Sequence, residues 1–206
     1  MKKIIGLLFI FTFGLFFIGC DKEVSISKEV VFDCANDKHA VIATENVEKV
    51  SKVIYNNQEL NDNEFSFFNQ KILIEDEYLK NLGYGNYTFI VEIDNEKYNV
   101  VVYVSDSRTS KLSLDSLYNY NNANIVIPIE LYDATFELFY KDEKIDNYKI
   151  EDGKLNIFAS FIELCGEENI VLKYKFTYRS LENPKEFLNN SGDINIKKIL
   201  FGEIEW

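Results

Sequence analysis

The chain has 206 residues, of which 34 are acidic and 22 basic, so its formal net charge is −12 at pH 7. The acidic residues are spread over residues 21–206 rather than gathered in one tail. Such a surface repels phosphate groups, so composition argues against nucleic acid as a partner and against binding to anionic lipid through basic side chains.

The first nineteen residues have the pattern of a secretory signal peptide. Met1-Lys2-Lys3 is a short basic start, and residues 4–18 are apolar apart from one hydroxyl and carry no charge. This apolar run has the length expected in a signal peptide and is shorter than the ~18–20 residues that a membrane-spanning helix needs. Residues 1–19 are therefore left out of the predicted fold.

The segment Phe17-Ile18-Gly19-Cys20 resembles the lipobox of bacterial lipoproteins, although Phe17 stands where that family usually has Leu. The resemblance implies that Cys20 is acylated, with palmitate among the attached chains, and that it becomes the first residue of the mature protein. It also implies a lipidated tether over residues 20–28 and a location on the extracytoplasmic face of a membrane. Each buried methylene contributes about 0.8 kcal/mol, so two or three chains would anchor the protein stably. The alternatives are an uncleaved amphiphilic anchor that contains Gly19-Cys20 by chance, and a buried core helix.

Short apolar stretches bounded by Asn, Asp and Gly follow, and they predict β-strands. Tyr, Phe, Ile and Val dominate these stretches, and several alternate polar with apolar residues, as half-buried strands do. The sequence therefore predicts an all-β protein. The clearest predicted strands are 39–44, 50–55, 71–76, 87–93 and 98–105 in the first half, and 124–131, 134–140, 154–158 and 169–178 in the second.

An internal repeat divides the mature chain into two similar units. HAVIATE (39–45) aligns with NIVIPIE (124–130) at an offset of 85 residues. After a two-residue gap, KILI (71–74) aligns with KLNI (154–157), and YLKNLG (78–83) with FIELCG (161–166). The predicted domains are therefore residues 29–110 and a diverged second copy over residues 111–206.

A unit of this size with about seven short strands predicts an immunoglobulin-like β-sandwich. VIYNNQEL (53–60) and EYLKNLGYGNYTF (77–89) resemble the small immunoglobulin-like modules appended to bacterial cellulosomal and cell-wall-active enzymes. The six-residue segments 78–83 and 161–166 predict single helical turns that close one end of each sandwich. The second unit differs mainly at residues 177–193, which predict a longer polar loop and a candidate partner-binding surface.

The residues that catalysis or metal binding would require are scarce. His39 is the only histidine and starts a predicted strand, and no nucleophile, phosphate-binding or zinc motif occurs. Cys34 and Cys165 lie at non-equivalent positions of the repeat and are predicted to be free, buried thiols. Acidic loops at 33–37 and 62–64 offer oxygen atoms to calcium but lack the spacing of a calcium loop. We expect no catalytic residue, no cofactor and no dedicated metal site.

Aromatic residues are the remaining candidates for ligand contact. In LYNYNN (117–122), predicted to lie at the junction of the units, Tyr118 and Tyr120 alternate with Asn, as in surfaces that bind sugars or proteins; a strand or hinge would look the same. The sequence predicts a lipid-anchored surface protein with a non-catalytic binding, adhesion or scaffold role, and the expected partner is a protein. The alternative, implied by the resemblance, is a carbohydrate- or cell-wall-binding accessory lipoprotein. A third reading is a hydrolase that uses paired carboxylates.

Overall fold

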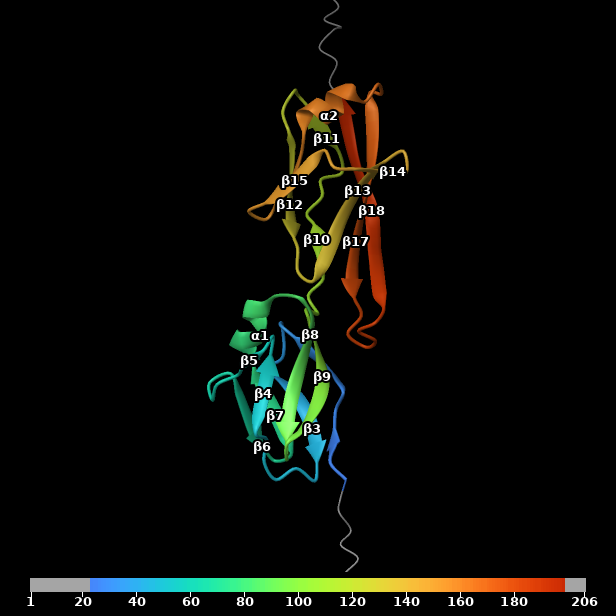
Figure 1. Ribbon diagram of the computed structural model, residues 1–206. Helices are drawn as coiled ribbons and strands as arrows, with labels where there is room; N and C mark the ends of the chain where they lie inside the picture. The colour runs from blue at the N-terminus through green and yellow to red at the C-terminus, as the bar shows by residue number, and fades with distance from the viewer. Residues whose placement is uncertain (1–22, 199–206) are drawn as a thin grey trace, which may run out of the picture.

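The computed structural model describes residues 23–198, so the predicted signal peptide and Cys20 lie outside the described residues. The all-β prediction is confirmed: the described chain forms four sheets and two short helices, arranged as two sandwiches placed end to end (Figure 1). Each sandwich packs a four-stranded sheet against a five-stranded sheet.

The first unit has the strand order of an immunoglobulin domain. Its sheets are β1-β3-β7-β6 and β2-β9-β8-β4-β5, which correspond to strands A-B-E-D and A′-G-F-C-C′. Strand β2 runs parallel to β9, whereas the other pairs in this unit are antiparallel. The elements are β1 (Ser25–Ile26), β2 (Glu29–Asp33), β3 (His39–Glu45), β4 (Lys52–Tyr55), β5 (Gln58–Glu59), β6 (Phe65–Phe68), β7 (Lys71–Glu75), α1 (Asp76–Leu82), β8 (Gly85–Ile93) and β9 (Glu96–Ser105). Pairing thus begins at Ser25, inside the segment expected to be tether.

The second unit repeats this order strand for strand. Its sheets are β10-β12-β16-β15 and β11-β18-β17-β13-β14, and β11 runs parallel to β18 as β2 does to β9. The elements are β10 (Lys111–Leu112), β11 (Tyr118–Tyr120), β12 (Ile125–Glu130), β13 (Ala134–Tyr140), β14 (Glu143–Ile145), β15 (Tyr148–Glu151), β16 (Lys154–Ile157), α2 (Ala159–Leu164), β17 (Asn169–Arg179) and β18 (Phe187–Lys198).

Strand register confirms the internal repeat at the level of single residues. Ala40 lies opposite Ile74 in the first unit, and Ile125 lies opposite Ile157 in the second. These pairs are related by the offsets of 85 and 83 residues that the sequence alignment gives on either side of its gap. The repeat is therefore a repeat of structure as well as of sequence.

Each unit has its own hydrophobic core, made by alternate residues of facing strands. Ile42, Ile72 and Phe89 are fully buried in the first core, and Ile127, Leu155 and Leu172 in the second. Full burial of such a side chain contributes about 1.5–3 kcal/mol. The two cores share no residue, so each unit carries the apolar contacts that hold it together.

The two predicted helical turns are confirmed as α1 and α2. Leu79 of α1 is fully buried, and Gly83, with a φ of 82°, ends the helix in a conformation that favours glycine. Behind it, the hydroxyl of Tyr87 donates to the carbonyl oxygens of Leu82 and Gly83 at 2.6 and 3.1 Å. This arrangement is the tyrosine corner of immunoglobulin domains.

The prediction of a loop over 177–193 is wrong for most of that segment. Strand β17 continues to Arg179 and β18 begins at Phe187, so only residues 180–186 form a turn. In the first unit the equivalent hairpin turns at Asp94 and Asn95. Asn, Asp and Gly have low strand propensity, but residues 187–197 of β18 pair with β17, and this pairing outweighs the local preference.

Neither of the two described helices is long and apolar enough to cross a membrane.

Candidate interaction site at the junction of the units

The linker between the units, residues 106–110, is held by a buried carboxylate. The side chain of Asp106 is fully shielded from solvent and accepts hydrogen bonds from the Arg108 backbone N and guanidinium and from the Tyr84 hydroxyl at 2.9 Å. The Arg108 guanidinium lies 4.1 Å from the ring centre of Tyr132, a residue of the second unit. This linker therefore joins the α1 end of the first unit to the second.

Ionisation in this network follows from its contacts. Burial acts to raise the pKa of Asp106, but the hydrogen bonds and charge of Arg108 outweigh it, so the pKa lies below the ordinary value. Burial and the hydrogen bond to Asp106 raise the pKa of Tyr84 to about 12. The phenol therefore stays a donor and the carboxylate an acceptor at neutral pH.

Direct hydrogen bonds also cross the junction. The Ser105 hydroxyl at the end of β9 donates to Asp133 in the second unit at 2.5 Å. The Asp33 carboxylate accepts the backbone N of Ser107 at 2.9 Å and the side-chain amide of Asn36 at 2.7 Å. The end of β9 is thus bonded directly to the second unit, and the linker is bonded to Asp33 of β2 through Ser107.

The long β17–β18 hairpin reaches back to the first unit. Lys185, in its turn, pairs with Glu29 of β2 at 2.6 Å. The guanidinium of Arg179 lies 5.5 Å from the ring centre of Tyr103 in β9 and 5.0 Å from that of Phe187, and it donates to the carbonyl of Pro184. The hairpin therefore spans the junction from the outside.

The chain has two arginines, and both lie at this junction. A guanidinium can stack its flat face on an aromatic ring while the N–H groups in its plane donate hydrogen bonds, whereas the ammonium group of lysine is a compact, strongly hydrated charge. In a chain that otherwise uses lysine, this placement is a compositional signal that sequence analysis missed.

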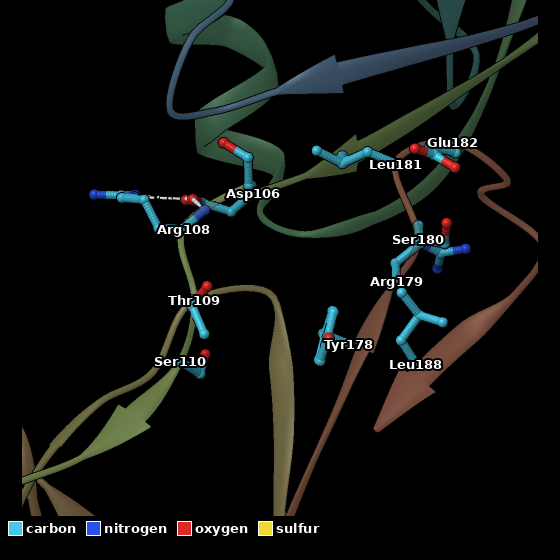
Figure 2. A pocket seen from close by; sticks show the side chains of 11 residues that line it. Asp106, Arg108, Thr109, Ser110, Tyr178, Arg179, Ser180, Leu181, Glu182 and Leu188 are labelled. Atoms are coloured by element: carbon cyan, nitrogen blue, oxygen red, sulfur yellow. Dashed lines mark hydrogen bonds and ion pairs between the residues drawn. The ribbon is translucent and has the colours of Figure 1, made fainter. Parts of the chain in front are cut away.

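A cavity of about 320 Å³ lies between the linker and the hairpin (Figure 2). Linker residues form one wall, and Tyr178, Leu181 and Leu188 contribute apolar surface from the hairpin side. A second cavity of about 270 Å³ lies under the same hairpin and is lined by Tyr84, Tyr132 and Phe187 among others.

Strand β18 presents an unpaired edge beside this cavity. It pairs with β17 throughout but meets β11 only at residues 196–198, and no described residue pairs with that edge over residues 187–195. This stretch, FLNNSGDIN, contains one charged residue, Asp193. The equivalent free stretch of β9, residues 96–100, is shorter and carries Glu96 and Lys97.

Tyr118 and Tyr120 lie away from this site. Both belong to β11, which pairs with the last residues of β18, whereas the junction is at the other end of β18, so the expectation that 117–122 forms the junction is wrong. Tyr120 is 4% exposed, belongs to the second core and donates to Glu163 at 2.9 Å. The Tyr118 hydroxyl accepts the backbone N of Asp115. Their contact with a ligand stays a prediction, now weakened by the burial of Tyr120.

The remaining candidates for chemistry are occupied or weakly reactive. Cys34 and Cys165 are free, as predicted, and Cys165 is buried; the prediction of burial is wrong for Cys34, which is half-buried. Burial, together with the charge of Asp106, raises the pKa of Cys34 to about 11, and burial raises that of Cys165 as well, which disfavours the reactive thiolates. His39 starts β3 as predicted, with Nδ1 3.1 Å from Glu75. No group of three or more potential metal-ligating His, Cys, Asp or Glu residues occurs within residues 23–198.

Comparison with known proteins gives likeness of fold alone. No family model matches the chain, and no curated protein matches it. Among solved structures, a pair of tandem immunoglobulin domains of titin is 11% identical with a TM-score of 0.35, covering 85% of this chain and 96% of its own. A tri-modular GH5 endo-β-1,4-glucanase from Bacillus licheniformis gives 11% and 0.36, and extracellular domains 3–5 of Drosophila OTK give 14% and 0.34. The match to the endoglucanase covers 85% of this chain and only 38% of the endoglucanase chain. The match to OTK covers 83% of this chain and 58% of the OTK chain.

Proposed function

We propose that this protein is a non-catalytic, lipid-anchored binding protein on the extracytoplasmic face of a membrane, and that β18 binds an extended segment of a partner protein. The observation that supports the partner class is the unpaired edge of β18 over residues 187–195. A free edge offers a row of backbone N–H and C=O groups, and a partner strand can satisfy them by extending the sheet.

The composition of this edge favours that role. Sheet edges that must stay unpaired are commonly protected by lysine, proline or bulges. This edge has neither lysine nor proline and extends over about 30 Å at roughly 3.3 Å per residue. Its hairpin is also longer than that of the first unit, so the edge projects beyond the body of the sandwich (Figure 1).

The lipid anchor would fix the direction in which the protein projects. Four residues separate Cys20 from Ser25, the first paired residue, so the two α-carbons lie at most about 18 Å apart in a fully extended chain. The first unit would therefore stand close to the membrane, with the second unit and its hairpin farther out.

Carbohydrate binding has less support. Proteins usually bind polysaccharide by stacking the sugar rings on exposed aromatic side chains. Tyr120, one of the two aromatic residues predicted to contact a ligand, is buried in the second core. Catalysis lacks support as well, because the pKa values of both thiols are raised, which disfavours the nucleophilic thiolates. We therefore place protein recognition first.

The lipid anchor is tested by metabolic labelling with a palmitate analogue, comparing the wild type with Cys20→Ala. We expect label and membrane association in the wild type and neither in the variant. Equal labelling of both proteins would contradict acylation at Cys20.

The binding edge is tested by a photo-crosslinking amino acid placed at Asn190 on intact cells. Asn156 serves as the control, because its strand, β16, has a neighbour on each side. We expect a discrete protein adduct from position 190 and none from 156. Identical adducts from both positions, or none from either, would remove the support for this edge.

A further inference from the structure

We infer that the 320 Å³ cavity beside β18 is a specificity pocket that receives one large aromatic side chain of the partner strand. The inference rests on the proposed function: β18 supplies backbone pairing, and the cavity selects the partner. In strand-addition complexes, backbone hydrogen bonds give affinity and pockets for alternate side chains give specificity.

The first argument is that edge and cavity share a residue. Leu188 belongs to the free stretch of β18 and also lines the cavity. Side chains alternate along a strand, and Ile194 and Ile196 are buried in the core, so Leu188 lies on the same inward face. A strand added to this edge keeps that alternation and directs every second side chain toward the face on which the cavity lies.

The second argument is the chemistry of the lining. Tyr178, Leu181 and Leu188 give apolar surface on one side, and Thr109 and Ser110 give hydroxyl groups on the other (Figure 2). Ser110 Oγ already accepts the backbone N of Tyr132 at 3.0 Å, and its own proton and second lone pair remain for another partner. Apolar walls with hydroxyl groups suit the ring of Tyr or Trp, which pairs an apolar body with one polar atom.

The third argument is charge. Arg108 is paired with Asp106, and Arg179 is held by two aromatic rings and the Pro184 carbonyl. The cavity also contains Glu182, so its charged residues nearly cancel. A strongly charged ligand gains little here, whereas a neutral aromatic group is compatible with the lining.

A second copy of this chain fits the cavity less well than a different protein. The inward positions of the free stretch are Leu188, Asn190, Gly192 and Ile194, and none is aromatic. Ile194 is moreover 1% exposed because it fills its own core. Self-pairing through β18 would therefore leave the pocket without its aromatic side chain.

The experiment begins with selection of phage-displayed nine-residue peptides on residues 20–206 carrying Cys20→Ser, which contains both cores complete. We expect selected peptides of low charge with one Tyr or Trp among alternating β-branched residues. Synthetic versions are then titrated calorimetrically, and replacing the aromatic residue by Ala should weaken binding by about tenfold or more, the effect of losing one well-buried anchor.

Two kinds of variant separate the pocket from the edge. Leu188→Trp and Leu181→Trp fill the cavity and should also weaken peptide binding by about tenfold or more. Val126→Trp, at an exposed valine of β12, is the control and should leave peptide binding unchanged. Asn189→Pro and Asn190→Pro test the edge. The N–H groups of successive strand residues point in opposite directions, so of Asn189 and Asn190 one donates toward β17 and the other toward the free edge. The proline variant at the second of these positions removes a donor from the free edge without breaking the pairing with β17, and this variant should keep the melting temperature of the wild type.

The outcomes are distinct. Loss of binding with both kinds of variant supports pocket and edge together. If proline abolishes binding but filling the cavity does not, the proposed edge function stands and the pocket inference is overturned. If neither matters, both are overturned. Selection of no peptide, together with concentration-dependent dimers that proline abolishes, would overturn the inference in favour of a second copy as the occupant.

Discussion

The guanidinium of Arg108 donates to both carboxylate oxygens of Asp106, from Nε at 2.8 Å and from Nη2 at 2.5 Å, while half of the arginine side chain remains in solvent. This pair stands where the chain passes from one unit to the other. Because Asp106 also accepts the hydroxyl of Tyr84, its single carboxylate links the end of the first sandwich to the linker. The stability of the junction should therefore depend on the charge of Asp106.

Acid should weaken the junction, and Asp106→Asn should remove part of that effect. The pKa values of Asp106 and Asp33 are both lowered in the fold, since hydrogen bonds outweigh the opposing effect of burial. A lowered pKa gives stability that is present above the ordinary value of 3.8 and lost as the pH falls through the folded value. We expect Asp106→Asn to lower the free energy of unfolding by about 2 kcal/mol at pH 7. Below pH ~4 the free energy of unfolding should fall less steeply in this variant than in the wild type.

Urea unfolding followed by circular dichroism measures both effects. The exposed Asp146→Asn is the control, and equal curves for the two variants would contradict the prediction.

Tyr87→Phe should destabilise the first unit alone. The lost hydroxyl leaves the carbonyls of Leu82 and Gly83 without their donor, which costs about 1–1.5 kcal/mol. Hydrogen exchange should show faster exchange of the backbone amides of β8 and unchanged exchange in β17. The second unit has Ile170 at the equivalent position and makes no such hydrogen bond. Tyr98→Phe removes an exposed hydroxyl that donates to Glu96 and should cost less than about 0.5 kcal/mol. The prediction fails if the two variants are equally stable.

The architecture was predictable because its signals are local or repeated. The apolar alternation of HAVIATE and its copy NIVIPIE marks β3 and β12, and the matched offsets fix the two units before any contact is known. Strand β18 was missed since residues such as Asn189, Ser191 and Gly192 favour turns when read alone. Their strand conformation comes from pairing with β17, a contact that composition does not encode.

The site was hidden for a related reason. Asp106 and Arg108 are close in sequence, but Tyr132, Arg179 and Lys185 reach the junction only through folding of the second unit. Tyr118 and Tyr120 fall near the boundary of the units along the chain, which is why the sequence favours them as contact residues. In space, the chain runs to the other end of the second unit before it forms β11.

Tyr120→Ala should act on folding and Tyr118→Ala much less. Tyr120 is buried among the second core and donates to Glu163, so its removal leaves a cavity and should cost about 3–5 kcal/mol. Tyr118 only borders that core, so Tyr118→Ala should lower the free energy of unfolding by about 1 kcal/mol. Thermal and urea unfolding measure the difference. A folded, fully stable Tyr120→Ala protein would reopen the case for Tyr120 as a ligand-contact residue.

Gly192→Ala should destabilise β18, because the added methyl group would collide with Tyr174 on the neighbouring strand β17. A Cβ at Gly192 would lie 2.6 Å from the hydroxyl oxygen of Tyr174 and 2.8 Å from its ring, and that ring packs against Phe136 and Phe176. Displacing it should cost about 1–2 kcal/mol. Gly166→Ala is the matched control, because a Cβ there meets nothing within 4 Å. In the background of Tyr174→Val the cost at Gly192 should largely vanish, and an additive double mutant would contradict this explanation.

Shortening the β17–β18 hairpin should free the two units to move relative to each other. Replacing residues 177–189 by Asp-Asn, the turn of the first unit, removes both the ion pair of Lys185 with Glu29 and the contact of Arg179 with Tyr103. Each contact contributes about 1 kcal/mol or less, so the variant should keep both folded cores. We expect small-angle X-ray scattering to give a broader distribution of interatomic distances than the wild type. Lys185→Glu keeps the hairpin but repels Glu29, and should give an intermediate result that high salt reverses. An unchanged scattering curve for the shortened chain would mean that the linker network around Asp106 alone holds the units in place.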